Sequence, residues 1–326
     1  MLWMITLLGC ITHIVDRVTV DRVVGFGKEF SDTQKPCALG ESLGHVLLAT
    51  QSFSKKPELA MVIANGTSGI CAQQRAWEER LRLERAKVQR DLDDPFRIAE
   101  IRDAQYAAER YDRLAAYRFQ LAYNNLENAY GELGGDCPTI KEKDEVVYLI
   151  GLISGTFAVL HDKQSGGQLG VPLDLLPKIA RSSRCLNTEK WWYVPQALRA
   201  GIWANVPGSG PVDVDNWATV EQAATMGGQT GVRVAYGIAT LLAANAGQDD
   251  FLQKMLVAHG NSVQTVPTNP DWAFFDQYAT EVSLFQSDVL WTSAKGHRSP
   301  RLGQLPVAEE ENTVLPSNNS EDDPFE

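Results

Sequence analysis

The chain has 326 residues, of which 44% are hydrophobic and 22% charged, a composition typical of folded globular proteins. It excludes collagen-like and wholly disordered chains, and the formal net charge of −11 argues against a general binder of nucleic acid or anionic membranes. The charge is concentrated at one end, because seven acids and no base follow Arg301. The five His and five Cys are few and scattered, so we expect neither a metal site nor a cofactor.

The first ten residues, MLWMITLLGC, are apolar and end in Leu-Leu-Gly-Cys. Ten residues are too few to span a bilayer, which needs about 20. The pattern is typical of a bacterial lipobox, in which the cysteine is lipidated, and it predicts lipidation of Cys10 after a signal peptide over 1–10. A signal peptide should open with Lys or Arg, and this segment contains neither. The alternatives are a start inside a longer signal, or a buried N-terminal helix or strand that ends in cysteine.

Strand signals are weak and are confined to a short valine-rich stretch over 18–24. Helical periodicity begins at residue 38, and a helix over 38–50 is expected to present one apolar face. That face carries Leu39, Leu43, Val46 and Leu47. Pro57 opens a second helical segment, and a third runs over 73–92 with many Arg and Glu side chains. Between these two, the Gly-Thr-Ser-Gly of 66–69 resembles a nucleophile elbow but has the wrong spacing.

Asp94 and Pro95 match the cap and first position of a new helix, which we expect to end at the glycines after residue 130. The next segment, 144–160, is almost wholly apolar. It is too short and too rich in glycine to span a membrane, so it predicts a buried central helix. Further helices are predicted over 173–185, 195–204, 214–226, 231–246, 249–259 and 271–290.

These elements predict an all-α fold of antiparallel helix pairs over 11–295. Helical hairpins joined by short loops are typical of tetratricopeptide-like α-solenoids, although no strict 34-residue period is present. We therefore expect degenerate hairpins in a solenoid-type bundle. Residues 296–326 contain mainly Gly, Pro, Asn, Ser and acids, so they predict a disordered acidic tail.

Four cysteines remain when Cys10 is set aside, and an even number in an exported chain suggests disulfides. We favour Cys37–Cys71 and Cys137–Cys185, because each pair joins neighbouring segments. The alternative is four reduced thiols. No C-x-x-C motif is present, and this argues against the usual zinc and thioredoxin-like sites.

Catalytic signatures are absent from the sequence, which contains no H-E-x-x-H, G-x-S-x-G, Walker A or G-x-G-x-x-G motif. His161 and Asp162 adjoin, but neighbours on a helix point about 100° apart and cannot form a base–orienter pair. The chain is therefore expected not to be an enzyme.

Aromatic residues gather in two segments, 191–203 and 272–291. Such side chains line ligand pockets and interfaces, and the alternative is helix–helix packing. The residues we expect to bind a ligand or partner are Trp192, Tyr193, Trp203, Trp272 and Phe275.

Four segments in succession have a recognisable helical character. The first is AAERYDRLAAYRFQLAYNNLENAYG over 107–131, and the second is the apolar EVVYLIGLISGTFAVLHD over 145–162. The third, over 175–208, begins with a Leu-Pro helix and ends in a Pro-Gly loop. The fourth, over 227–259, is an apolar helix, a turn and a helix ending in LQKMLVAH. Together they resemble the periplasmic T-component lipoproteins associated with tripartite ATP-independent periplasmic (TRAP) transporters. Cys185, Trp191-Trp192 and the acidic tail depart from the family pattern.

The resemblance implies a tetratricopeptide-like lipoprotein anchored by lipid in the periplasm, with a solute-binding protein as partner. It also implies a homotrimer with a central pore and hydrophobic clefts. Ile11 stands where an Asp would commonly retain a lipoprotein at the inner membrane, so the outer membrane is favoured. The expected function is a non-enzymatic scaffold for the partner or a relay for an apolar ligand. The alternatives are a structural subunit of a larger envelope or extracellular assembly, and an enzyme whose site has no recognised motif.

Overall fold

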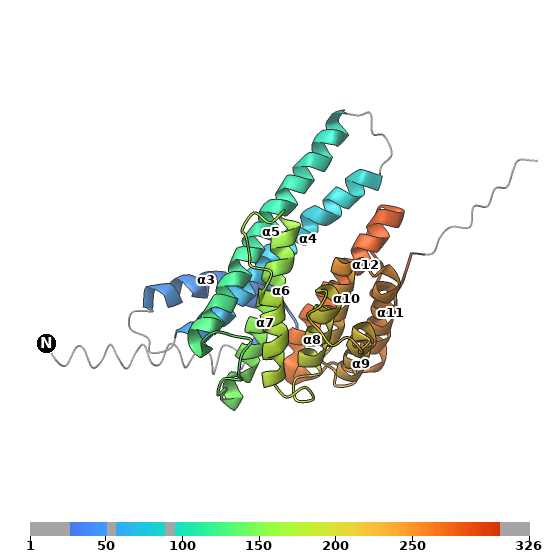
Figure 1. The fold of residues 1–326 in the computed structure, drawn as a ribbon. Coiled ribbons are helices and arrows are strands. Elements are labelled where there is room, and N and C mark those ends of the chain that lie inside the picture. Colours follow the sequence, from blue (N-terminus) through green and yellow to red (C-terminus); the bar gives the residue numbers. More distant parts are fainter. Residues whose placement is uncertain (1–26, 51–56, 89–94, 307–326) are drawn as a thin grey trace, which may run out of the picture.

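The structure is a computed structural model that describes residues 27–50, 57–88 and 95–306 (Figure 1). Within these ranges it contains ten α-helices, α3 to α12, and no strand, which confirms the predicted all-α fold. Cys10 and its signal segment, the valine-rich stretch over 18–24 and residues 307–326 lie outside the described residues.

The helices differ greatly in length, from 8 residues in α7 to 36 in α5. They are α3 (Gln34–Thr50), α4 (Glu58–Val88), α5 (Pro95–Tyr130), α6 (Glu145–Gln164), α7 (Leu175–Ser182), α8 (Val194–Asn205), α9 (Asn216–Gly228), α10 (Val234–Ala246), α11 (Asp249–Thr265) and α12 (Ala273–Lys295). Short 3-10 turns cover Glu142–Asp144, Ser183–Cys185 and Pro270–Trp272. Because helix lengths do not recur at a fixed period along the described chain, any repeat within it is degenerate.

Helix α4 joins two segments that the sequence predicts as separate. The Gly-Thr-Ser-Gly of 66–69 lies inside this single 31-residue helix and forms no turn. Its glycines permit close packing, since a Cβ at Gly69 would lie 2.6 Å from the Phe119 ring of α5. Tertiary packing thus compensates for the low helix propensity of glycine, which costs about 1 kcal/mol relative to alanine.

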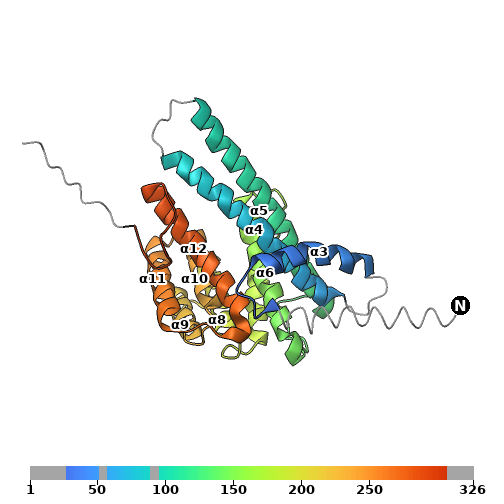
Figure 2. The ribbon, with the colours of Figure 1, turned by 180° about the vertical axis from the view of Figure 1, so that it is seen from behind.

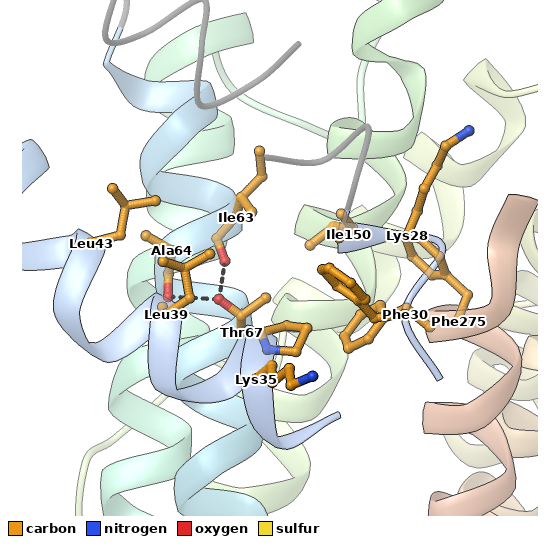
Figure 3. A pocket seen from close by; sticks show the side chains of 14 residues that line it. Lys28, Phe30, Lys35, Leu39, Leu43, Ile63, Ala64, Thr67, Ile150 and Phe275 are labelled. Atoms are coloured by element: carbon orange, nitrogen blue, oxygen red, sulfur yellow. Dashed lines mark hydrogen bonds between the residues drawn. The ribbon is translucent and has the colours of Figure 1, made fainter. Parts of the chain in front are cut away.

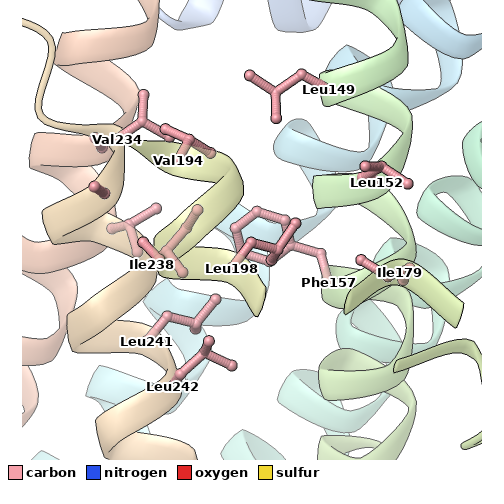
Figure 4. Packing of buried hydrophobic residues seen from close by; sticks show 14 of the residues in the cluster. Leu149, Leu152, Phe157, Ile179, Val194, Leu198, Val234, Ile238, Leu241 and Leu242 are labelled. Carbon is pink, nitrogen blue, oxygen red and sulfur yellow. The ribbon is translucent and has the colours of Figure 1, made fainter. Parts of the chain in front are cut away.

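The helices form two groups, which meet where α4 packs against α12 and where side chains of α6 face α8 and α10 (Figures 1 and 2). The long hairpin of α4 and α5 lies on one side of α6 and extends beyond the rest of the molecule, while α8 to α12 lie on the other. In Figure 4, Leu149, Leu152 and Phe157 of α6 face apolar side chains of α8 and α10. Among the described helices, Glu142–Gln164 alone is long and apolar enough to cross a membrane, but 83% of its apolar window is buried inside the chain. It is the central core helix that the sequence predicts.

Two disulfides have the predicted pairing. Cys37 of α3 bonds to Cys71 of α4, and Cys137 of the α5–α6 connection bonds to Cys185 after α7, with Cα–Cα distances of 5.2 and 5.3 Å. Each bond therefore joins two elements that neighbour each other in the fold.

Residues 296–306 fold back along α12 and are not disordered, so the predicted start of the tail at 296 is wrong. The Trp291 indole donates a hydrogen bond to the Gln304 carbonyl at 2.8 Å, and Leu302 is buried against α11. The close approach uses two glycines, because a Cβ on Gly260 would lie 2.6 Å from the Cα of Gly303. Composition alone does not show such a backbone contact.

Candidate functional site: an apolar pocket under helix α3

Helix α3 and the residues before it close over α4 and the start of α12 (Figure 2). The Phe274 amide of α12 donates to the Lys28 carbonyl at 2.9 Å, and Thr33 donates to Glu281 at 2.8 Å. Residues 27–33, which we call the strap, are thereby attached to α12. Helix α3 itself is attached through the Cys37–Cys71 disulfide.

The contact between α3 and α4 is close at Gly40 and looser on either side. A Cβ at Gly40 would lie 2.8 Å from the Ser68 amide nitrogen, so only glycine permits this approach. Glu41 accepts a hydrogen bond from Arg118 of α5 at 2.7 Å, and Leu47 packs fully buried against α4. Leu39 is still 46% exposed. The apolar face predicted for this helix is therefore only partly covered.

The uncovered part of that face lines a cavity of about 300 Å³ between the strap, α3, α4, α6 and α12 (Figure 3). Its walls are mainly apolar side chains of Phe30, Leu39, Leu43, Ile63, Ile150 and Phe275. The volume is at the lower end of the range for ligand sites, about 300–1,000 Å³, and largely apolar walls are typical of such sites. The cavity therefore suits a narrow apolar group.

A smaller cavity of about 70 Å³ lies next to this one, on the side of the core. The two share Thr67, Ile150, Phe274 and Phe275 as lining residues, so they adjoin. The Thr67 hydroxyl donates to the Ile63 carbonyl of its own helix at 2.8 Å, so this donor is already paired within α4. We call the two adjoining cavities together the α3 pocket, which extends from the strap toward the bundle interior.

Three of the five aromatic residues singled out in the sequence meet beside this pocket. The ring centroid of Trp272 lies 4.8 Å from that of Trp192 and 5.6 Å from that of Phe275. Phe275 lines both cavities, whereas Trp192 is only 5% exposed and is covered by its own chain. Phe275 is thus placed at the pocket, Trp272 beside it, and Trp192 supports them from behind.

The turn before α8 holds Trp192 in this position. Trp192 and Tyr193 have positive φ values of 52° and 61°, a region that costs non-glycine residues of order 1–3 kcal/mol each. The Trp192 carbonyl lies against Gly227, where a Cβ would come within contact distance. Such strain persists only where the surrounding packing imposes it.

The remaining two predicted residues do not reach the pocket. Tyr193 and Trp203 are half-buried, and Trp203 packs on Gly210 with the Arg199 guanidinium 5.7 Å from its ring centroid. The structure therefore does not bring the five residues together at one site.

A chain of buried polar side chains begins at the inner end of the pocket. The Tyr278 hydroxyl donates to the Gln73 side-chain carbonyl, and the Gln73 amide lies 2.9 Å from Nε2 of His161. Nδ1 of His161 lies 2.7 Å from Asp112, which also pairs with Arg80. Burial raises the pKa of Tyr278 well above its usual range.

The direction of this chain follows from its ends. Because Tyr278 donates to Gln73, the amide of Gln73 donates to Nε2 of His161, and Nδ1–H of His161 donates to Asp112. His161 and Asp112 of α5 are thus arranged as a base and the carboxylate that orients it. The adjacent Asp162 does not have this role. Asp162 instead accepts from the amides of Leu169 and Val171. Both ring nitrogens of His161 are occupied, so neither is open to a substrate.

Among the residues that the structure describes, no group of three or more His, Cys, Asp or Glu side chains is arranged to hold a metal ion. Comparison of the chain with family models, with curated proteins and with solved structures finds no match.

Sequence reasoning missed most of the pocket. Phe30 belongs to no predicted element, and Ile63 and Ile150 read as ordinary core positions on their helices. One signal was present, since the predicted face of 38–50 carries four apolar residues on a helix of moderate length. The apolar face of α3 is broader than its neighbouring helix can cover. This pattern would have drawn attention to α3.

Proposed function

We propose that the chain is a non-enzymatic binding protein that holds an apolar ligand in the α3 pocket and relays it to a partner in the cell envelope. The observation that supports this most is the apolar cavity under α3, with a second apolar cavity on the other side of Thr67, Ile150 and Phe275. An open apolar cavity of this size is costly to leave hydrated, because burying apolar surface contributes about 25 cal/mol per Å². The fully occupied nitrogens of His161 agree with a binding function.

The cellular setting belongs to the same proposal and depends on sequence features. The lipobox at Cys10 and the resemblance to TRAP T-component lipoproteins suggest a lipid-anchored periplasmic protein, at the outer membrane. Its partner would be a periplasmic solute-binding protein, and its own assembly a trimer. Two disulfides agree with an oxidising compartment.

Displacement of a neutral fluorescent apolar probe, such as N-phenyl-naphthylamine, tests ligand binding. Ala64 is buried in α4 and lines the outer cavity, so Ala64→Phe is designed to fill it. We expect this variant to lose probe binding. Val212→Phe is the matched control, because Val212 is 98% exposed and lies in the loop before α9. Equal probe binding by both variants would contradict the proposal.

The partner is tested separately in the native organism by crosslinking in intact envelopes, followed by purification of the chain. Recovery of a periplasmic solute-binding protein is the expected result. Recovery of only a multisubunit shell or polymer would instead indicate a structural subunit.

A further inference from the structure

The charged residues at the α3 pocket are all of one sign. Lys28 and Lys35 line the outer cavity, and no Asp or Glu is among its lining residues (Figure 3). This sign is opposite to the net charge of −11 for the whole chain. Two cations at the rim of an otherwise apolar cavity form an amphipathic site.

Lys28 is placed to remain available to a ligand. Its carbonyl is fixed by the Phe274 amide of α12, and its ammonium lies 4.3 Å from the centroid of the Trp272 ring. Among the described residues no carboxylate forms an ion pair with Lys28. The ring holds the cation near the rim without neutralising it, since a cation–π contact leaves the positive charge in place.

Lys35 is more exposed and less free. Its ammonium lies 3.9 Å from a carboxylate oxygen of Asp32, one turn earlier, and both side chains are largely open to solvent. Figure 3 places the Lys28 and Lys35 ammonium groups apart, on either side of Phe30. Because Lys35 already pairs with Asp32, and Lys28 has no carboxylate partner among the described residues, Lys28 is the stronger candidate.

We propose that the α3 pocket takes an amphiphile with an anionic head, such as a fatty acid, whose single apolar chain enters along Ile63 and Ile150 while its carboxylate stays at the rim near Lys28. This inference rests on the proposed function, because it assigns the ligand class of the same pocket. The volume of about 300 Å³ favours one chain over a multi-chain lipid. An anionic head at the rim is attracted to the Lys28 ammonium group and remains hydrated, so its binding incurs little desolvation cost.

The test uses three ligands with the same tail and different heads: dodecanoate, dodecanol and dodecyltrimethylammonium. Each competes, below its micelle concentration, with the neutral probe on the full chain. We expect dodecanoate to bind tightest and the cation weakest. Exposed ion pairs contribute about 0.2–1 kcal/mol, so Lys28→Gln should weaken dodecanoate by up to about 5-fold. The same change should leave dodecanol binding unaltered.

Two further variants separate charge from shape. Lys28→Arg keeps the charge and is expected to retain dodecanoate preference, and Lys35→Gln is expected to have a smaller effect than Lys28→Gln. Equal affinity for all three heads, or equal loss of dodecanoate and dodecanol in Lys28→Gln, would overturn the anionic-head assignment while leaving apolar binding intact. Failure of the neutral probe itself to bind would refute the pocket as a ligand site.

Discussion

The Cys37–Cys71 disulfide attaches α3, which forms one wall of the α3 pocket, to α4. The Cys137–Cys185 disulfide lies away from that pocket, and none of its residues lines either cavity. Replacing each cysteine pair with serine therefore removes one disulfide in each variant, at the α3 pocket in one case and away from it in the other. We expect both double variants to be destabilised, and only Cys37→Ser with Cys71→Ser to lose ligand binding.

The loss of stability follows from the length of chain that each bond closes. In the chain-entropy model, a separation of 34 residues corresponds to about 3.8 kcal/mol and one of 48 residues to about 4.1 kcal/mol. These figures differ by less than the uncertainty of an unfolding measurement. The two double variants should therefore show nearly equal decreases in the free energy of unfolding in urea.

Binding should separate the two variants. Without its disulfide, α3 is retained mainly by the Glu41–Arg118 ion pair and the packing of Leu47. The apparent affinity of a ligand that needs α3 docked is its intrinsic affinity multiplied by the docked fraction. A tenfold loss of affinity corresponds to a docked fraction of about one tenth, so undocking must be favoured by about 1.3 kcal/mol once the disulfide is absent. We expect a reduction of about this size for the neutral probe in the Cys37/Cys71 variant.

The assay is titration of the neutral probe into both variants without urea, and folding is checked by circular dichroism. The Cys137/Cys185 variant should bind as the unmodified chain does. Equal binding by the two variants, or an equal loss in both, would refute the idea that α3 acts as a wall held by Cys37–Cys71.

Three further predictions address the core and the anchor. His259 is fully buried, and burial, with the nearby Arg233 cation, lowers its pKa to about 3. The unfolded chain therefore binds a proton below about pH 6.5 that the folded chain excludes, so stability should fall by up to about 1.4 kcal/mol per pH unit as pH decreases. His259→Asn should flatten the urea-unfolding profile between about pH 6.5 and pH 5, and an unchanged slope would contradict this assignment. The buried Arg233 side chain pairs with Asp276 at 2.6 Å and also donates to Ser262. Arg233→Met leaves the Asp276 carboxylate buried without its partner, so it should lower the free energy of unfolding in urea by about 3–5 kcal/mol. A loss below about 1 kcal/mol would show that the pair is not buried in solution. If Cys10 is lipidated, as its lipobox predicts, Cys10→Ser should release the chain from membranes into the soluble periplasmic fraction, and retention in the membrane fraction would argue against the lipobox.

Local sequence patterns were sufficient for most elements of this fold, with α4 as the exception. The helical periods, the Pro95 start and the apolar run of 144–160 predict helices close to α5 and α6, because capping and amphipathic spacing act within a few residues. Cysteine number and spacing were also sufficient to favour the pairing of Cys37 with Cys71 and of Cys137 with Cys185. The Gly-rich 66–69 segment was misjudged, since its helix depends on close packing against α5 and α6.

Contacts between distant segments were decided only by the tertiary structure. Residues 296–306 pack on α11 and α12 through a glycine–glycine contact, and His161 pairs with Asp112 across 49 positions of the chain. The pocket has the same origin. Gly40 brings α3 against α4, while Phe30 of the strap and Phe275 of α12 line the same cavity although they are far apart in the chain. Periodicity shows which face of a helix is apolar, but the area left uncovered depends on the neighbour that packs against it, and that neighbour is set by the whole fold.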